Sequence, residues 1–171
     1  LVACVWISGL GEVGASLVWG LYHYQFHNVP LFVPPGHALL YLLGLVLAER
    51  LPPRVLALVP VLAAPFVMLL GWTRIDTLSP WLFGLFVLFM LFGRERRLYA
   101  VMFVIALILE IVGTTFGNWT WPTQVRGVGL VTLNPPLAAG VFYCLLDWFV
   151  SLRARLGDRP LLPPSVRTIP T

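Results

Sequence analysis

Long apolar runs alternate with short polar links along most of the chain. The runs predicted to form helices cover residues 2–22, 32–49, 54–71, 80–93, 98–116 and 129–152. A helix needs roughly 20 apolar residues to cross the hydrocarbon core of a bilayer, and a shorter span is accommodated by local thinning of the bilayer. The pattern therefore predicts an all-α polytopic membrane protein with six transmembrane helices.

Signals at the ends of the runs refine this prediction. The first run lacks a basic leader and carries Glu12, which favours a retained helix over a cleaved signal peptide. Ser79 and Pro80 open the fourth run and suit the N-cap and the first helical position. The end of the chain is rich in Arg and Pro, so we expect two parts, a transmembrane domain of residues 1–152 and a cytoplasmic tail of residues 153–171.

The composition supports lipid as the surroundings of the chain. Hydrophobic residues make up 59% and charged residues 11%, with a mean hydropathy of +0.90, which is too apolar for a soluble domain of 171 residues. The net charge is +4, and all basic residues are arginines. These arginines fall in short clusters between the runs and not on one solvated face, which argues against a nucleic-acid partner.

The distribution of arginines predicts the orientation in the membrane. Only Arg74 and Arg126 lie in the links after the first, third and fifth runs. All other arginines lie after the second, fourth and sixth runs. Since arginine is enriched on the cytoplasmic side, we expect both termini in the cytoplasm.

Two stretches of the chain share an order of residue types. Each has a glutamate, a glycine shortly after it, an aromatic cluster, a Pro-Pro pair and a tyrosine. The matching residues are Glu12 and Glu110, Pro34-Pro35 and Pro135-Pro136, and Tyr41 and Tyr143. Either the match is chance, or the first two runs and the last two form a parallel repeat, and sites often form where such repeats meet.

Glu12 and Glu110 are the candidate catalytic residues. An ionisable group inside a membrane span is costly and is a functional candidate by default. An apolar environment favours the neutral form of a carboxyl group, which can then donate a proton, and two carboxyls in unlike environments can divide the roles of donor and acceptor. The alternative is that each acid hydrogen-bonds a neighbouring helix and fixes its packing.

Polar and aromatic residues near the two acids are candidate contacts for a substrate. They are Trp119, Trp121, Asn118, Asn134, Tyr22, Tyr24 and His37. Aromatic faces attract a cationic intermediate, and the two asparagines could place an amide beside an acid. Asp147 follows Tyr143 by one turn, which favours a structural Asp–Tyr or Asp–Arg interaction.

The sequence contains no strong metal or cofactor motif. His23 and His27 are four residues apart but lead into Pro30 and lack acidic companions, so we predict no metal and no cofactor. Cys4 and Cys144 lie in apolar runs, which is typical of buried, reduced thiols.

One segment carries a family resemblance. Its motif residues are Glu110, Gly113, Gly117, Trp119, Trp121, Gly129 and Asn134-Pro135-Pro136. In this pattern the segment resembles the membrane-integral carotenoid biosynthesis proteins, namely the bacterial carotenoid hydratases and, more distantly, the small lycopene cyclases. The chain lacks the Pro-x-Glu-Glu/Asp motif of those cyclases.

The resemblance implies a function as well as a location, the bacterial inner membrane. Glu110 would protonate a double bond of an isoprenoid or carotenoid-like lipid, and aromatic faces would stabilise the carbocation. Glu12 would direct water or remove a proton, as in a hydratase or a cyclase-like lyase or isomerase. The substrate would arrive sideways from the lipid.

Two other functions remain open at this stage. The chain could be a non-catalytic accessory subunit of a membrane complex that binds lipid or pigment, or a small proton-coupled transporter. The two acids on one apolar cleft open to lipid would favour the enzyme. A direct bond between them would favour the accessory subunit, and a continuous polar path to the cytoplasm would favour transport.

Overall fold

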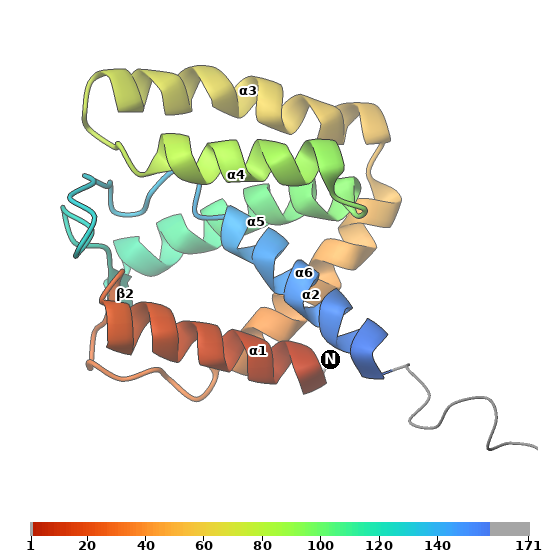
Figure 1. Cartoon of the computed structure of the whole chain (residues 1–171), viewed down its shortest axis with the longest axis horizontal. Coiled ribbons are helices and arrows are strands. Elements are labelled where there is room, and N and C mark those ends of the chain that lie inside the picture. Colours follow the sequence, from red (N-terminus) through yellow and green to blue (C-terminus); the bar gives the residue numbers. More distant parts are fainter. Residues whose placement is uncertain (1, 158–171) are drawn as a thin grey trace, which may run out of the picture.

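The computed structural model describes residues 2–157, and most of this part is helical (Figure 1). The helices are α1 (Val2–Glu12), the π-helix η1 (Val13–Trp19), α2 (Val33–Arg50), α3 (Pro53–Trp72), α4 (Ser79–Phe92), α5 (Arg96–Thr115) and α6 (Val141–Gly157). Two short strands, β1 (His23–Tyr24) and β2 (Trp119–Thr120), lie in the links between helices. The prediction of an all-α chain is therefore confirmed for the part described, apart from this small ribbon.

Four of the predicted apolar runs match helices closely. Helices α2 to α5 begin and end within two residues of the predicted runs. Their limits follow local chemistry: Pro34, Pro53 and Pro80 lie in the first turns of α2, α3 and α4, where a missing N–H costs nothing. The apolar pattern was therefore sufficient to locate these elements.

The first run ends earlier than predicted. The helical conformation stops at Trp19 and not at residue 22, because Gly20 adopts a left-handed conformation with φ of 73°. The chain then turns back, and the N–H of Leu21 donates to the carbonyl of Ala15 over 2.8 Å.

The sixth helix begins later than predicted. Residues 129–140 were expected to be helical, but α6 starts at Val141. Pro135 and Pro136 have no N–H, and Gly129 has a φ of 71°, so this segment cannot form regular helical hydrogen bonds. The segment forms part of a long link instead.

Helix α4 is capped by a residue that the sequence did not suggest. Ser79 is the first residue of α4 and not its N-cap. The buried side chain of Asp76 accepts the N–H of Leu78 over 3.1 Å and the N–H of Ser79 over 2.8 Å. Its second oxygen accepts the N–H of Leu137 over 3.4 Å, which ties the start of α4 to the link before α6.

Helix α5 forms the centre of the fold. It packs against α2, α3, α4 and α6, and its buried residues run from Leu98 to Phe103 and include Ala106. Helix α1 packs against α2 and α6. Gly140 allows α6 to start close to the backbone of Phe103, where a side chain would overlap.

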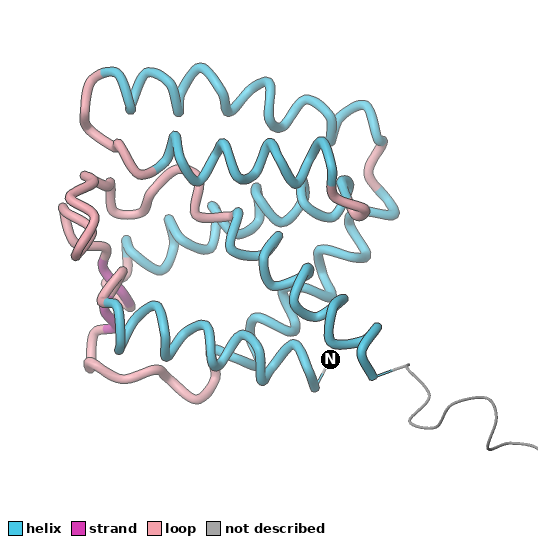
Figure 2. The backbone as a smooth tube through the Cα atoms, in the orientation of Figure 1, coloured by secondary structure: helices cyan, strands magenta, loops and turns pink. Residues whose placement is uncertain are grey.

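The links lie alternately at the two ends of the helices (Figure 1). Links 20–32, 73–78 and 116–140 lie together at one end, where Figure 2 also shows the strand pair. The N–H of Thr77 donates to the carbonyl of Val131 over 2.8 Å there. At the opposite end, the guanidinium group of Arg97 donates to the carbonyl of Glu49 over 3.1 Å.

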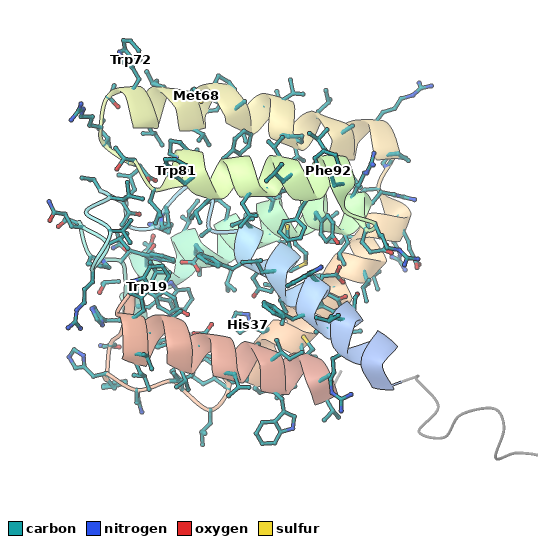
Figure 3. The ribbon with its side chains drawn as sticks, viewed as in Figure 1. Trp19, His37, Met68, Trp72, Trp81 and Phe92 are labelled. Atoms are coloured by element: carbon teal, nitrogen blue, oxygen red, sulfur yellow. The ribbon has the colours of Figure 1, made fainter. Side chains whose placement is uncertain are left out.

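The outer surface is apolar. Three helical segments, Val2–Trp19, Pro53–Trp72 and Arg96–Thr115, are long and apolar enough to cross a membrane, and Ser79–Phe92 is a shorter apolar helix. Large apolar side chains face outward, such as Trp72, which is 89% exposed and projects from α3 in Figure 3. These features are compatible with a membrane protein.

Candidate functional site

The strand pair brings four aromatic residues from two distant links together. Strands β1 and β2 are antiparallel, with Tyr24 opposite Trp119. Because side chains alternate between the faces of a strand, Tyr22 and Tyr24 share one face with Trp119 and Trp121. The ring centroids are 5.0 Å apart for Tyr22 and Trp121 and 6.0 Å apart for Tyr24 and Trp119. This aromatic face covers the ends of α1 and α5, where the two candidate acids lie.

Glu12 is buried and accepts three hydrogen bonds. The hydroxyl groups of Tyr22 and Tyr24 donate to its Oε2 over 2.5 Å and 2.6 Å, and Nε2 of His37 lies 2.8 Å from its Oε1. Glu12 is the last residue of α1, directly before the π-helix η1, and π-helical turns are frequent at functional sites. The carboxyl group is therefore held as an acceptor by groups from the first link and from α2.

Tyr24 remains a donor over a wide pH range. Burial raises the pKa of its phenol well above the ordinary value of 10.0, and the nearby charge of Glu12 raises it further. The hydroxyl group keeps its proton, so it can donate to Glu12 at any physiological pH.

His37 extends the Glu12 cluster to α6. Its Nδ1 lies 2.6 Å from the hydroxyl oxygen of Tyr143. If Tyr143 donates to Nδ1, the neutral imidazole carries its proton on Nε2 and donates to Glu12. Glu12, His37 and Tyr143 therefore form one continuous hydrogen-bonded chain, and Figure 3 shows His37 between α1 and α6.

Glu110 has a different environment. Its Oε2 accepts the indole N–H groups of Trp119 over 2.8 Å and Trp121 over 3.0 Å. Its Oε1 has no hydrogen-bond partner among residues 2–157 but is accessible, since no buried unpartnered side-chain oxygen occurs in that part. Gly113 lies against the ring of Trp119, where any side chain would overlap the indole. One oxygen of Glu110 is therefore fixed, and the other is free.

Both acids line the same cavity. The cavity has a volume of about 670 Å³ and lies between α1, α2, α5 and α6. Apart from Glu12, Glu110 and a few other polar groups, its lining consists mainly of apolar side chains. This volume lies within the range of about 300–1,000 Å³ typical of small-molecule sites. The arrangement can hold an apolar molecule against two carboxyl groups in unlike surroundings.

Comparisons of the chain with models of known protein families, with curated proteins and with solved structures find no match. The resemblance to carotenoid biosynthesis proteins therefore stays a prediction that the comparisons do not support.

The structure gathers most of the predicted site residues around the cavity. Five of them line it: Glu12, Tyr22, His37, Glu110 and Trp121. Tyr24 and Trp119 do not line it, but each donates a hydrogen bond to one of the acids.

The two asparagines lie apart from the cavity. Oδ1 of Asn134 accepts the backbone N–H of Trp121 over 2.9 Å, so this amide holds two parts of link 116–140 together. The side chain of Asn118 is exposed, and its backbone forms two hydrogen bonds: the carbonyl accepts the N–H of Gln25 over 2.9 Å, and the N–H donates to the carbonyl of Gly113 over 2.9 Å. Neither asparagine is among the residues that line the cavity, and within residues 2–157 neither amide hydrogen-bonds Glu12 or Glu110. Asn134 therefore acts through its side chain on the backbone of Trp121, and Asn118 acts through its own backbone.

Tyr143 is a member of the site that the sequence reading did not single out for binding. It was noted only as part of the repeat and as a neighbour of Asp147. In the structure it lines the cavity and pairs with His37, whereas Asp147 accepts hydrogen bonds from Tyr41 over 2.5 Å and Tyr99 over 3.0 Å. The prediction of an Asp–Tyr interaction for Asp147 is confirmed, with different tyrosines.

The remaining candidates do not form a metal centre. Within residues 2–157, no group of three or more His, Cys, Asp and Glu residues could hold a metal ion. His23 and His27 are exposed, with ring centroids 6.5 Å apart. Cys4 and Cys144 are buried and unpaired, as predicted.

Proposed function

We propose that this protein is an integral membrane protein with six transmembrane helices and both termini in the cytoplasm, located in a bacterial inner membrane. The alternation of links between the two ends supports six crossings. The short α4, with 14 residues, can cross where the bilayer is locally thinner. The arginine-rich links at one end support the orientation.

We further propose that the protein binds an unsaturated isoprenoid or carotenoid-like lipid in the cavity and transfers a proton to one of its double bonds. The observation that carries this proposal is the position of Glu12 and Glu110 on one apolar cavity. Leu10 and Phe149 line the cavity and are 71% and 46% exposed, so its edge meets the lipid-facing surface. An apolar substrate can therefore arrive from the bilayer without crossing water.

Glu110 is the proton donor in this mechanism. Its free Oε1 carries the proton, since the apolar lining disfavours a charge there. The proton forms a new C–H bond with one alkene carbon, the π electrons of the double bond supply the bonding pair, and the other carbon becomes cationic. The indole N–H groups of Trp119 and Trp121 then stabilise the carboxylate that remains on Glu110.

The Glu12 cluster completes the reaction. Tyr22 and Trp121 line the cavity, and aromatic rings attract a cationic carbon. The chain of Glu12, His37 and Tyr143 accepts one proton, either from a water molecule that adds to the cation or from a carbon next to it. The first path gives a hydrated product and the second an isomer with a shifted double bond.

A second candidate function is a non-catalytic accessory subunit that holds a lipid or pigment. The three hydrogen bonds to Glu12 favour it, because they join α1, the first link and α2 as a structural clamp would. Proton-coupled transport has less support, since Leu145, Leu146 and Phe149 make the cavity lining beyond Tyr143 apolar.

Deuterium incorporation tests the proposed reaction. The purified protein in lipid nanodiscs is incubated in D₂O with a lipid extract of cells that accumulate lycopene, and the extract is examined by liquid chromatography and mass spectrometry. We expect wild type to form a hydrated or isomeric product with deuterium on carbon, and Glu110→Gln to lose at least about 100-fold in rate. Glu49→Gln, an exposed glutamate outside the cavity, is the matched control.

The outcome separates the two candidate functions. No labelled product from folded wild-type protein would contradict proton transfer to a carotenoid such as lycopene. Retention of a bound lipid without turnover would then favour the accessory subunit.

A further inference from the structure

The cavity has an arginine at the end opposite the two acids. Arg153 of α6 lines the cavity together with Phe149 and Leu152. Arg153 follows Tyr143 by ten residues on α6, which corresponds to about 15 Å along the helix axis. The cavity is therefore elongated, with carboxyl groups at one end, a guanidinium group at the other and an apolar lining between them.

Arg153 differs from two other arginines at its end of the molecule. Arg96 donates to the carbonyl of Leu91 over 2.6 Å, and Arg97 donates to the carbonyl of Leu51 over 2.9 Å. Both therefore donate hydrogen bonds to backbone carbonyl groups at the C-terminal ends of helices. The side chain of Arg153 is exposed and has no hydrogen bond to the residues whose side chains the structure describes, 2–153. It remains available to a ligand.

The charges at the two ends would orient an anionic lipid. A guanidinium group binds phosphate and carboxylate groups through paired hydrogen bonds. The carboxylate of Glu12 repels such a group from the other end of the cavity. A headgroup of negative charge therefore has one favourable position, beside Arg153, and the hydrocarbon chain then extends toward Glu110.

We infer that the ligand of this cavity is a linear lipid with an anionic headgroup, held at Arg153, whose chain reaches Glu110. This inference deepens the proposed function and rests on it, because it names the substrate class of the same cavity. An isoprenoid phosphate combines the two requirements, since it has an anionic head and double bonds along its chain. The headgroup also fixes which double bond lies at Glu110.

Binding of matched lipids tests the inference without relying on turnover. The probes are geranylgeranyl phosphate, geranylgeraniol, which has the same chain without the charge, and inorganic phosphate. The protein is placed in nanodiscs of zwitterionic lipid, and binding is followed by the fluorescence of Trp121, which lines the cavity, with a Trp121→Phe subtraction. The variants are Arg153→Gln and Arg153→Lys, and Arg54→Gln is the control, an exposed arginine outside the cavity.

We expect wild type and Arg54→Gln to bind geranylgeranyl phosphate roughly tenfold more tightly than geranylgeraniol, the size of one charge-assisted hydrogen bond. Arg153→Gln should remove this difference and leave the affinity for geranylgeraniol unchanged, and Arg153→Lys should restore part of it. Unchanged binding of geranylgeraniol also shows that the variant is folded. Equal affinities in wild type, or a difference that persists in Arg153→Gln, would overturn the inference, and so would tight binding of inorganic phosphate alone.

A straight-chain lipid phosphate distinguishes the source of the headgroup and separates this inference from the proposed function. Lysophosphatidate that binds as tightly as geranylgeranyl phosphate, and with the same dependence on Arg153, supports the anionic headgroup but contradicts an isoprenoid chain. If wild type transfers no deuterium but still binds geranylgeranyl phosphate in a way that depends on Arg153, the proposed reaction is contradicted and the inference about the headgroup stands.

Discussion

The N-terminal and C-terminal parts of the site use the same plan with different donors. In each, a glutamate near the end of a helix accepts hydrogen bonds from two aromatic residues of the following link. Glu12 takes two phenols and a histidine, and both of its oxygens are occupied. Glu110 takes two indoles on one oxygen, and its other oxygen is accessible.

This difference supports the proposed division of roles between the two acids. Three donors stabilise a carboxylate, so the Glu12 cluster suits an acceptor. Indole groups donate but carry no charge, and the free oxygen of Glu110 lies at an apolar cavity, so Glu110 suits a donor. Similar local sequence patterns can therefore give unlike chemistry when the donors differ.

The largest expected effect is on the donor. Glu110→Gln should reduce deuterium transfer by at least about 100-fold, because an amide of the same shape cannot donate a proton as an acid. The unfolding temperature of the protein in detergent should change little, since the amide oxygen can still accept both indole N–H groups. A variant that keeps its transfer rate would contradict the assignment of Glu110 as donor.

The next effect concerns the stability of the Glu12 cluster. Glu12→Ala leaves two phenols and a histidine without their acceptor and should lower the free energy of unfolding by about 3 kcal/mol, as expected when one member of a buried polar cluster is removed. Thermal unfolding followed by circular dichroism measures the change, and Glu110→Ala is the comparison. If Glu110→Ala lowers the free energy of unfolding more than Glu12→Ala does, the hydrogen bonds to Glu12 are not the larger contribution to stability.

A smaller change should displace one donor from Glu110. Gly113→Ala places a methyl group where the ring of Trp119 lies, so the indole must move, at a cost of about 1–3 kcal/mol. The matched control is Gly84→Ala in α4, where a methyl group meets no atom within 4 Å. Unfolding curves and the emission of Trp119 give the readout. Equal behaviour of the two variants would show that Trp119 is not held against Gly113.

The smallest effect depends on pH. The pKa of Tyr24 is raised in the folded protein by burial and then by Glu12, relative to an ordinary value of 10.0. Its contribution to stability is therefore complete below pH 10 and falls as the pH rises above that value, because only the unfolded chain releases the proton easily. In wild type the free energy of unfolding should fall between pH 9 and pH 11, and Tyr24→Phe should reduce this fall by about 1 kcal/mol. An unchanged slope would contradict this.

The sequence predicted the helices of this fold better than its links. Apolar runs located α2 to α5 because a continuous run with proline in its first turn leaves little choice of conformation. The late start of α6 and the strand pair were missed. Both depend on contacts between distant links, such as Asp76 with Leu137 and Tyr24 with Trp119, which no local pattern encodes.

The residue types of the site were also predictable, but their pairing was not. An acid in an apolar run and nearby aromatics stand out in any single sequence, so Glu12, Glu110 and their donors were found. The hydrogen bond between Tyr143 and His37 joins residues 106 positions apart, and no local sequence pattern near either residue indicates it. Asn118 and Asn134 do not line the cavity: the side chain of Asn134 accepts the backbone N–H of Trp121, and the side chain of Asn118 is exposed.

Infrared spectroscopy can show which of the two acids carries a proton. Spectra of the protein in nanodiscs, in H₂O and in D₂O, report the C=O stretch of any neutral carboxyl group. We expect such a band in wild type, and it should disappear in Glu110→Gln and persist in Glu12→Gln. A band that persists in Glu110→Gln and disappears in Glu12→Gln would make Glu12 the protonated acid and would contradict Glu110 as the donor.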